Sequence, residues 1–425
     1  MSDDTSTVES PRARYRHKSY LNKPGYRKLD IVKTIAAGED EATKRMAAAR
    51  WGETWETKQT CPHCGVIAAH YKCKSRWRWT CREKKCTQQF TVLSETRLHG
   101  AKMPAHKLLS ILHHFVEAKD SISARELSGL HNLNYQTMHV LLLKIREALA
   151  ESMRAEPQLT GFIQADAAYF IKYVRPGNIS TGASAAAKQD RNNAGKDETG
   201  KAAKKRTVSP NMHALVVFVQ MGLQGDRRYK VAKIKTETQV DMRSLGPTFC
   251  TQEEDKHTVL VTDQHDSYLD FGWQFEDHKR VNHTERFVSP DGMHTNLAEG
   301  FFSRMRTAHA GAWHRVSIQH LEIYGWEIAW RQTMVGSPNN VQLQDLLKRL
   351  LQSGRPSRFV DYWSKRAPHD RPDPDEVGAA VEVPASDIPK KMGRPKKGSL
   401  QVATREQIAA QLGSQAEPVE QRRTA

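Results

Sequence analysis

The sequence predicts a mixed α/β protein in which a sheet is covered by helices, preceded by a small metal-binding ribbon and a helical segment. Three observations predict this class. Short apolar runs between residues 161 and 261 have the length and composition of strands. Helical periodicity dominates after residue 296, and four cysteines between residues 61 and 86 form two pairs. Strands first and helices later, with acids at strand ends, are typical of a mixed sheet covered by helices.

Composition favours a polyanionic partner. The 425 residues have room for two or three domains, and 65 Lys and Arg against 48 Asp and Glu give a net charge of +17. This balance favours nucleic acid over a membrane, although a generically basic soluble protein has the same charge. No apolar run approaches a membrane span, the N-terminus has no apolar signal core, and five of the six cysteines are clustered. We therefore expect a reducing, cytoplasmic, nucleoid-associated location and no membrane partner.

Residues 1–55 are expected to form a basic arm followed by a helix. Arginines and lysines alternate with tyrosines up to about residue 28, which fits a flexible basic arm or a plain disordered leader. The stretch from Leu29 to Trp51 is rich in Ala, Glu, Lys and Arg, which predicts one helix.

Residues 56–100 are predicted to form a zinc ribbon. Two cysteine pairs, separated by sixteen residues, can each supply a thiolate knuckle to one tetrahedral Zn²⁺, and the four are Cys61, Cys64, Cys81 and Cys86. Cys73 is a spare thiol and Cys250 an isolated core thiol. Basic and aromatic residues alternate between the pairs, among them Arg76, Trp77, Arg78 and Trp79, which suits contact with a DNA backbone.

Residues 101–155 have the pattern of a helix-turn-helix. An amphipathic helix from residue 104 to 116 is followed by a capping box, Ser123 to Glu126, which begins a second, short helix. A turn at residues 131–134 precedes a third helix from Tyr135 to Leu149. A simple helical hairpin would show the same pattern, but the surrounding basic charge favours DNA binding.

The expected sheet domain, residues 160–335, carries acids at strand ends. Residues 161–166 are predicted to form a strand that ends in Asp166, and the run 259–261 leads into Asp263. Two further strands, 213–221 and 228–236, lie between them. The low-complexity stretch 175–206 is expected to be a disordered basic loop.

The segment from Asn296 to Arg306 is predicted to be a helix that carries functional side chains. Apolar residues recur every four positions, and Glu299 and Arg306, seven residues apart, lie on the same face. An acid and a base on one face, opposite a strand that ends in Asp263, suit a site for metal ions and a phosphodiester. The same residues have a simpler explanation, with Asn296 as an N-cap, Glu299 reaching back to it, and Asp263 starting a turn.

Residues 336–366 are predicted to form a C-terminal helical segment, and residues 367–425 a linker and basic tail. In the tail, Gly393, Arg394 and Pro395 are flanked by lysines, including Lys396 and Lys397. This extended cationic run resembles an AT-hook, which fits a narrow minor groove, although Met392 stands where such motifs carry Arg. A solvated basic tail has the same composition.

Several motifs, taken in order, resemble bacterial insertion-sequence transposases with a DDE catalytic domain and an N-terminal zinc ribbon, the ISXO-like group. The match covers roughly residues 45 to 335 and includes Asp166 after its strand and Val261-Thr262-Asp263. The longest matching stretches are Arg50-Trp51 before Cys61-Pro-His-Cys64-Gly65, Leu98-His99-Gly100-Ala101-Lys102, His294-Thr295-Asn296-Leu297-Ala298-Glu299-Gly300-Phe301-Phe302-Ser303 and Trp313-His314-Arg315-Val316-Ser317.

The resemblance implies an RNase H-like fold with Asp166, Asp263 and Glu299 as the acidic triad. Members of the group differ over whether the Asn, here Asn296, or the Glu is counted as the third catalytic residue. Ala167 replaces a usual Glu, and Arg306 replaces the Lys expected seven residues after Glu299. Arginine retains a phosphate-binding charge with fork geometry.

By this resemblance the expected activity is two-metal phosphoryl transfer on double-stranded DNA. Two Mg²⁺ or Mn²⁺ ions would be held by Asp166 and Asp263 with Glu299 or Asn296, and Arg306 would steady a phosphate. Water would cut the element's end, and the freed 3′-hydroxyl would attack target DNA, with the protein acting as a homo-oligomer on DNA. Two alternatives remain: a catalytically inactive DNA-binding derivative, and a nuclease that cuts without joining.

Overall fold

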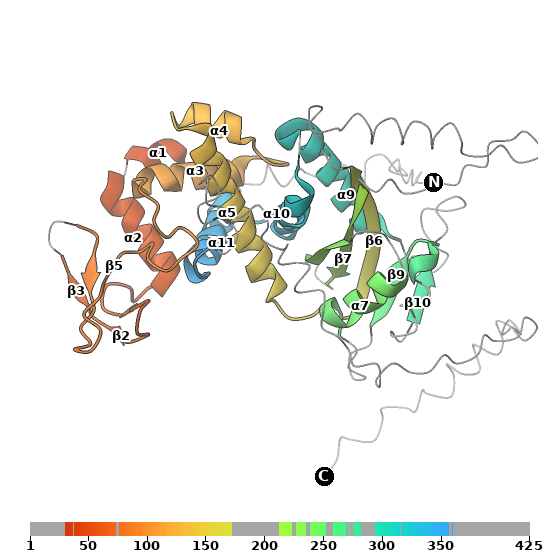
Figure 1. Ribbon diagram of the computed structural model, residues 1–425, viewed down its shortest axis with the longest axis horizontal. Coiled ribbons are helices and arrows are strands. Elements are labelled where there is room, and N and C mark those ends of the chain that lie inside the picture. The colour runs from red at the N-terminus through yellow and green to blue at the C-terminus, as the bar shows by residue number, and fades with distance from the viewer. Residues whose placement is uncertain are drawn as a thin grey trace, which may run out of the picture. The chain divides into compact units, whose positions relative to one another are not determined.

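The largest sheet among the described residues has five strands in the order β10-β9-β6-β7-β8. Figure 1 labels four of these strands, β6, β7, β9 and β10. β6 pairs antiparallel with β7 and parallel with β9, β7 pairs antiparallel with β8, and β10 is parallel to β9. This is the topology of an RNase H-like fold. The strands are β6 Phe162–Ile171, β7 Met212–Met221, β8 Arg227–Ile234, β9 Val259–Thr262 and β10 Asp277–Arg280. The computed structural model describes residues 30–36, 38–73, 76–171, 212–222, 227–234, 239–251, 258–268, 272, 275, 277–281, 294–314, 316–356 and 359.

Two separate apolar clusters cover the two faces of this sheet. On one face, side chains of β6, β7 and β8 pack against α9 (Asn296–Ala308) and α10 (Leu321–Thr333). On the other face, alternate residues of the same strands pack against α7 (Gln239–Phe249) and the short 3₁₀ turn η4 (Asp266–Tyr268). The alternation of a strand's side chains between the faces explains why neighbouring residues belong to different clusters.

α10 is the most deeply buried helix of the sheet domain. Every residue from Leu321 to Gln332 is buried, because the helix lies between the sheet and α5. A Cβ atom on Gly325 would lie 2.9 Å from side-chain carbons of both Leu215 and Val231, so the missing side chain allows the helix to approach β7 and β8 closely. α11 (Asn339–Gln352) packs on α2, α3 and α5, and η6 (Ile318–His320) precedes α10.

The predicted helix from Leu29 to Trp51 is two helices, α1 (Ile31–Ala36) and α2 (Gly38–Trp51). Gly38 has a φ of 74°, a left-handed conformation that breaks the helical path and that favours glycine. α2 leads into the ribbon, and Arg50 near its end donates hydrogen bonds to the carbonyls of Thr91, Val92 and Ser94. The ribbon strands are β1 Gln59–Thr60, β2 Ile67–Ala68, β3 Tyr71–Lys72, β4 Trp79–Thr80 and β5 Gln89–Phe90.

The segment predicted to be a helix-turn-helix forms three helices, α3 (Ala105–Glu117), α4 (Ala124–Leu130) and α5 (Tyr135–Arg154). The Ser123 hydroxyl accepts a hydrogen bond from the Glu126 backbone N–H at 3.0 Å, which confirms that α4 is capped there. α5 continues past the expected Leu149 to Arg154 because its C-terminal half is buried against α10 and α11. These helices share their apolar cluster with α9 and α10.

A buried ionic group links α5 to α10. The Glu327 carboxylate of α10 is fully buried and lies 2.6 Å from Nε of Arg146 on α5. It also accepts hydrogen bonds from Arg331 and from the Ser121 hydroxyl. Two arginines therefore share one carboxylate in the core between the helical segment and the sheet domain. None of the described helices is long and apolar enough to span a bilayer.

Candidate active site

A surface hollow of about 460 Å³ lies between β6 and α9. It is lined by Asp166 of β6 and by Asn296, Glu299, Ser303 and Arg306 of α9, four of which were predicted as site residues. Arg306 is exposed, lines the hollow and forms no ion pair among the residues that the structure describes, so its charge is open to the hollow. Oxygen ligands and a cation therefore meet in one opening.

Asp166 lies in the middle of β6, whereas the sequence predicted it at a strand end. β6 runs on to Ile171 because its antiparallel partner β7 continues pairing as far as Met212. The pairing with β9, however, ends at Gln164 and Val261. Asp166 therefore lies just beyond the last paired residues of β9, and its half-buried carboxyl accepts a hydrogen bond from the Ala167 N–H at 2.8 Å.

Asp263 directly follows β9, the strand that pairs in parallel with β6. Because Phe162 pairs with Val259 in parallel, continuing the register two residues past the last pair would set Asp263 level with Asp166 on the neighbouring strand. Neighbouring strands lie about 4.8 Å apart, and level residues of parallel strands face the same side. Asp263 also starts a turn, as the simpler explanation predicted, since its carboxylate accepts from the His265 N–H at 3.0 Å. It does not line the hollow itself.

The helix α9 is fixed over β6 by Gln164, a residue that the sequence did not reveal. Its buried side-chain carbonyl accepts from the Leu297 N–H at 2.9 Å, and its amide nitrogen lies 3.2 Å from Nδ1 of His294. This bond satisfies one of the free N–H groups at the start of α9. The side chain stands two residues before Asp166 on the same face of the strand, so it sets the position of α9 relative to that carboxyl.

The predicted N-cap at Asn296 is wrong. The cap is Thr295, whose side chain makes no capping bond, and Asn296 is the first helical residue. Glu299 stands one residue too far along for a capping box, although its carboxylate accepts a bond of 3.3 Å from the Thr295 hydroxyl. Because the cap comes from Gln164, the exposed side chain of Asn296 faces the hollow.

The C-terminal part of α9 is bound to the helix-turn-helix segment. Arg304 forms an ion pair of 2.9 Å with Asp120, in the connection between α3 and α4. The helix continues as a π-helical segment, η5 (His309–Trp313), and the Trp313 indole donates to the Ser121 hydroxyl at 2.7 Å. The helix that carries Glu299 and Arg306 is therefore held by the sheet at one end and by the helical segment at the other.

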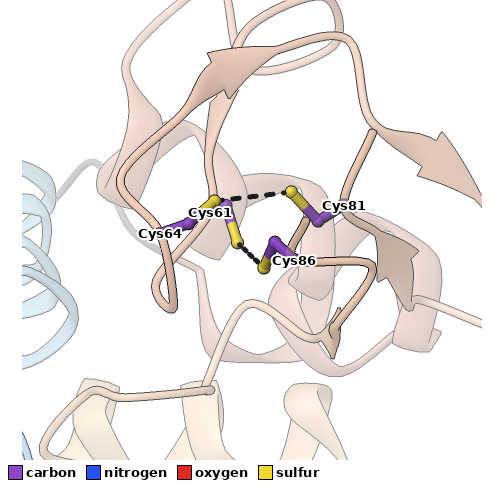
Figure 2. A group of neighbouring side chains, drawn as sticks. All are labelled: Cys61, Cys64, Cys81 and Cys86. Atoms are coloured by element: carbon purple, nitrogen blue, oxygen red, sulfur yellow. Dashed lines mark hydrogen bonds between the residues drawn. The ribbon is translucent and has the colours of Figure 1, made fainter. Parts of the chain in front are cut away.

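The four predicted ribbon cysteines converge on one point (Figure 2). The Sγ atoms of Cys61 and Cys86 are 3.9 Å apart, and those of Cys64 and Cys81 are 3.6 Å apart. Four sulfurs at the Zn–S bond length around a tetrahedral ion would be about 3.8 Å apart, so the cluster fits one Zn²⁺. Gly65 and Thr87 follow the second cysteine of each pair with φ of 76° and 47°, which shapes both knuckles alike.

Around this cluster the ribbon aromatics are largely structural. Trp79 is 1% exposed and packs edge-on against Trp51 with ring centroids 5.1 Å apart, so it is not available to contact DNA as the sequence suggested. Trp77 donates to Asp40, and Lys72 lies over its ring. Arg76 and Arg78 are exposed on the ribbon, whereas Arg394, Lys396 and Lys397, like the loop 175–206, lie outside the described residues.

The acidic residues are less tightly gathered than the cysteines. Within the described part of the chain, the ribbon cysteines are the one group of three or more possible metal ligands whose donor atoms lie within 4.8 Å of one another. Asp166 and Glu299 thus line one hollow, with Asp263 at the end of the neighbouring strand, without forming such a cluster. Their chemistry, carboxylate oxygens beside an amide, is nevertheless the donor set that Mg²⁺ and Mn²⁺ prefer.

Two family profiles match the chain. Residues 158–333 match the ISXO2-like transposase domain, and residues 37–89 match a transposase zinc-ribbon domain. These ranges contain the whole sheet domain with α9 and α10, and the ribbon with α2. A search of curated proteins found no match.

Solved structures with some likeness to the chain include two assemblies of the Mos1 transposase. A pre-cleavage Mos1 transpososome is 12% identical over 55% of this chain and 77% of that chain, with a TM-score of 0.20. A Mos1 strand transfer complex is 14% identical over 57% and 75%, also with a TM-score of 0.20. At these scores the likeness has no bearing on function.

Proposed function

The chain belongs to the ISXO2-like DDE transposases with an N-terminal zinc ribbon, and from that membership we propose that it cuts and joins DNA at insertion-sequence ends. Water would attack the phosphorus at the element's end, and the P–O3′ bond would break to leave a 3′-hydroxyl. That hydroxyl would then attack the phosphorus of a phosphodiester in target DNA, whose P–O3′ bond would break to leave a 3′-hydroxyl on the target strand. The observation that supports this best is the hollow where Asp166, Glu299 and Arg306 meet, with Asp263 at the end of the neighbouring strand.

We propose that Asp166 and Asp263 hold two Mg²⁺ or Mn²⁺ ions, with Glu299 or Asn296 completing the ligand set. Such ions, when bound, stabilise the attacking and leaving oxygens of an in-line displacement. The protein's own part is to bring the ligands together. Asp166 and Asp263 stand on paired strands, and Gln164 fixes the helix that carries Glu299.

Arg306 supplies the positive charge that the phosphodiester needs. It is the exposed cation of the hollow, and its guanidinium can donate hydrogen bonds to two phosphate oxygens in a forked geometry. On the helix it lies two turns from Glu299, so a phosphate held by Arg306 would lie along the same face as the carboxylates. The Arg304–Asp120 ion pair, two residues earlier on the helix, holds this part of α9 in place.

DNA binding would be divided among several elements. The helix-turn-helix, the exposed Arg76 and Arg78 of the ribbon, and the tail residues Arg394, Lys396 and Lys397 are the proposed contacts, and Zn²⁺ would hold the ribbon folded. Because an element has two ends, we propose that the protein acts on double-stranded DNA as a homo-oligomer.

Purified protein and a duplex that carries the element's terminal repeat, identified in the DNA beside the gene, test the proposal. With Mg²⁺ or Mn²⁺ we expect cleavage at the repeat and joining to a target plasmid. Asp166→Asn and Asp263→Asn should each reduce cleavage by about 1,000-fold or more without loss of DNA binding. An active Asp263→Asn protein would overturn the catalytic assignment.

The two alternatives give different results in the same assay. Binding with no cleavage by the wild-type protein under any divalent cation would indicate an inactive DNA-binding derivative. Cleavage with no joined product would indicate a nuclease.

A further inference from the structure

A second and larger hollow, of about 970 Å³, lies between the helix-turn-helix and the π-helical segment η5. One wall comes from α4 and the start of α5, with Arg125, Asn132 and Tyr135. The opposite wall comes from Trp313, the last residue of η5, and from His314, which follows it. The hollow shares no lining residue with the acidic one, and its volume is at the upper end of the range for ligand sites.

The charge of this hollow suits an anion. None of its described lining residues is Asp or Glu, whereas two are arginines and two are histidines. Arg146, at its floor, is buried and already paired with Glu327. Arg125 is exposed, and its guanidinium forms no ion pair that the structure gives among the described residues, so it is available to a ligand.

The backbone of the opposite wall is strained. His309–Trp313 is a π-helix, and His314 after it has φ 55° and ψ −37°, which a side-chain-bearing residue rarely adopts. Such segments persist only where the surroundings impose them, and they cluster at functional sites. The strain turns the chain at the end of α9 and leaves the exposed His314 on the wall of the hollow.

The first turn of α5 projects beside the same hollow. Tyr135, Gln136 and Thr137 are exposed, whereas Met138 is buried, and Asn134 caps the helix through the Gln136 N–H at 2.8 Å. In a helix-turn-helix, the N-terminal residues of the second helix contact base edges in the major groove while neighbouring elements contact phosphates. Base-reading and phosphate-binding positions thus lie side by side.

We propose that this hollow holds the sugar–phosphate backbone of the element's end, with Arg125 and His314 contacting phosphates while the first turn of α5 enters the major groove. This inference rests on the proposed function and extends it to the recognition of the substrate. Ser303 of the acidic hollow and Trp313 of this one are ten residues apart on one continuous helix. Ten residues span about 15 Å, which is roughly four to five base pairs of DNA.

DNA binding by the full-length protein tests this assignment without requiring cleavage. Arg125→Ala should weaken binding to the terminal-repeat duplex about tenfold and reduce the slope of log affinity against log salt by about 0.9, the contribution of one phosphate contact. Arg125→Glu should weaken it further. The matched control is Arg45→Ala, which removes the same charge from an exposed arginine already paired with Glu41 on α2. An affinity and salt slope equal to wild type in both Arg125 variants would overturn the proposal.

Replacement of single phosphates by neutral methylphosphonates maps the contact. We expect a methylphosphonate about four to five base pairs from the element's terminus to weaken the binding of the wild-type protein. The same replacement should leave the affinity of the Arg125→Ala protein unchanged. Sensitivity confined to other positions would contradict the placement. Failure of the wild-type protein to cleave DNA would refute the proposed catalysis. The salt dependence of binding and the methylphosphonate map would still test the phosphate contact, because neither requires cleavage.

Discussion

At the residue scale, the third catalytic ligand is the question that the site poses most directly. Glu299 and Asn296 both line the acidic hollow, and neither closes the cap of α9. Glu299→Gln keeps the shape but removes the charge, so we expect cleavage to fall by about 100-fold or more while DNA binding and thermal stability persist. Asn296→Ala should leave most of the activity and the stability. Strand-cleavage rates and thermal unfolding of both variants measure these effects. Full activity of the Glu299→Gln protein would indicate that Asn296, and not Glu299, is the third ligand.

Gln164 is the residue whose effect should be largest outside the proposed ligands. Gln164→Leu removes the bond to the Leu297 N–H and leaves that group unsatisfied near the sheet. We expect a loss of about 1 kcal/mol in the free energy of unfolding, typical of a lost cap, and a larger fall in cleavage than that stability loss explains. Urea unfolding measures the loss of stability. Single-turnover cleavage, measured about 20 degrees below the melting temperature of the variant, measures the fall in cleavage while the protein is still folded.

A matched control exists on the other face of the sheet. Gln220 of β7 accepts from the Thr160 N–H at 3.3 Å and does not contact α9. Gln220→Leu should therefore cost a similar amount of stability but leave cleavage near the wild-type rate. Equal losses of cleavage in the two variants would show that Gln164 acts only through general stability.

Sequence patterns could reveal the acids but not Gln164. Asp166, Asp263 and Glu299 follow apolar runs or stand on a periodic helix, which are local signals. Gln164 acts on Leu297, 133 residues away, and a polar residue inside a strand gives no indication of which helix its side chain will reach. The same limit applies to Trp79, whose burial depends on Trp51 of a separate helix.

At the element scale, the ribbon should depend on its metal. Cys61→Ser with Cys64→Ser removes two of the four sulfurs that converge in Figure 2. We expect metal analysis to find about one zinc per wild-type chain and none in the variant, with the ribbon unfolded. Cys73→Ser is the control, because this exposed thiol lies outside the cluster. Zinc retained at wild-type content after loss of both cysteines would contradict the assignment.

The buried carboxylate between α5 and α10 should control acid stability. Burial acts to raise the pKa of Glu327, but Arg146 and Arg331 outweigh it, so the pKa lies below its usual range. A carboxyl with a lowered folded-state pKa contributes stability above its unfolded pKa, about 4.3, and loses it as the pH falls through the folded value. Glu327→Gln should therefore cost about 3–5 kcal/mol at neutral pH and show a flatter loss of stability below about pH 4.

Urea unfolding from pH 3 to 7 measures this dependence. Glu156→Gln is the comparison, since Glu156 pairs with Arg349 at a partly exposed site where about 1 kcal/mol or less is expected. A Glu327→Gln protein as stable as wild type at neutral pH would show that the ionic group contributes nothing to the junction of α5 and α10.

Long periodic elements could be predicted from the sequence, whereas short or irregular ones could not. The helices α3, α5, α9, α10 and α11 and the strands β6 to β9 carry apolar patterns that survive in the structure. β10 is only Asp277-His278-Lys279-Arg280, an edge strand without an apolar pattern, and α7 contains Pro247, which argues against a helix. β10 forms because β9 pairs with it, and α7 forms because it packs on one face of the sheet. Both partners are distant in sequence, so a local pattern cannot reveal them.

At the scale of the whole molecule, the helices proposed to recognise DNA and the sheet domain proposed to carry out catalysis share one core. The apolar cluster that joins α9 and α10 to the sheet also contains residues of α2, α3, α5 and α11, and the chain up to Ala367 forms one compact unit. Removal of residues 1–150 would expose much of that cluster. Loss of DNA binding after such a deletion would therefore report unfolding, and point variants on the surface are the sharper tests of recognition.

The basic tail can be tested by deletion because it belongs to the second unit, Pro368–Ala425. Ending the chain before Lys390 removes Arg394, Lys396 and Lys397, and we expect the protein to remain folded but to bind duplexes of any sequence more weakly. If these three residues each contact a phosphate, the salt slope should fall by about 2.7. Anisotropy titrations from low to physiological salt measure both quantities.

The control for this deletion is a chain that ends at Gly398. It keeps the basic run and removes as many basic as acidic residues from the remaining tail, so its formal charge equals that of the full chain. An AT-hook-like contact should leave this control at wild-type affinity, with a preference for A·T-rich duplexes that disappears in the shorter chain. An unchanged affinity and salt slope in the shorter chain would refute a tail contact, and a lost slope without any A·T preference would reduce the tail to a nonspecific polycation.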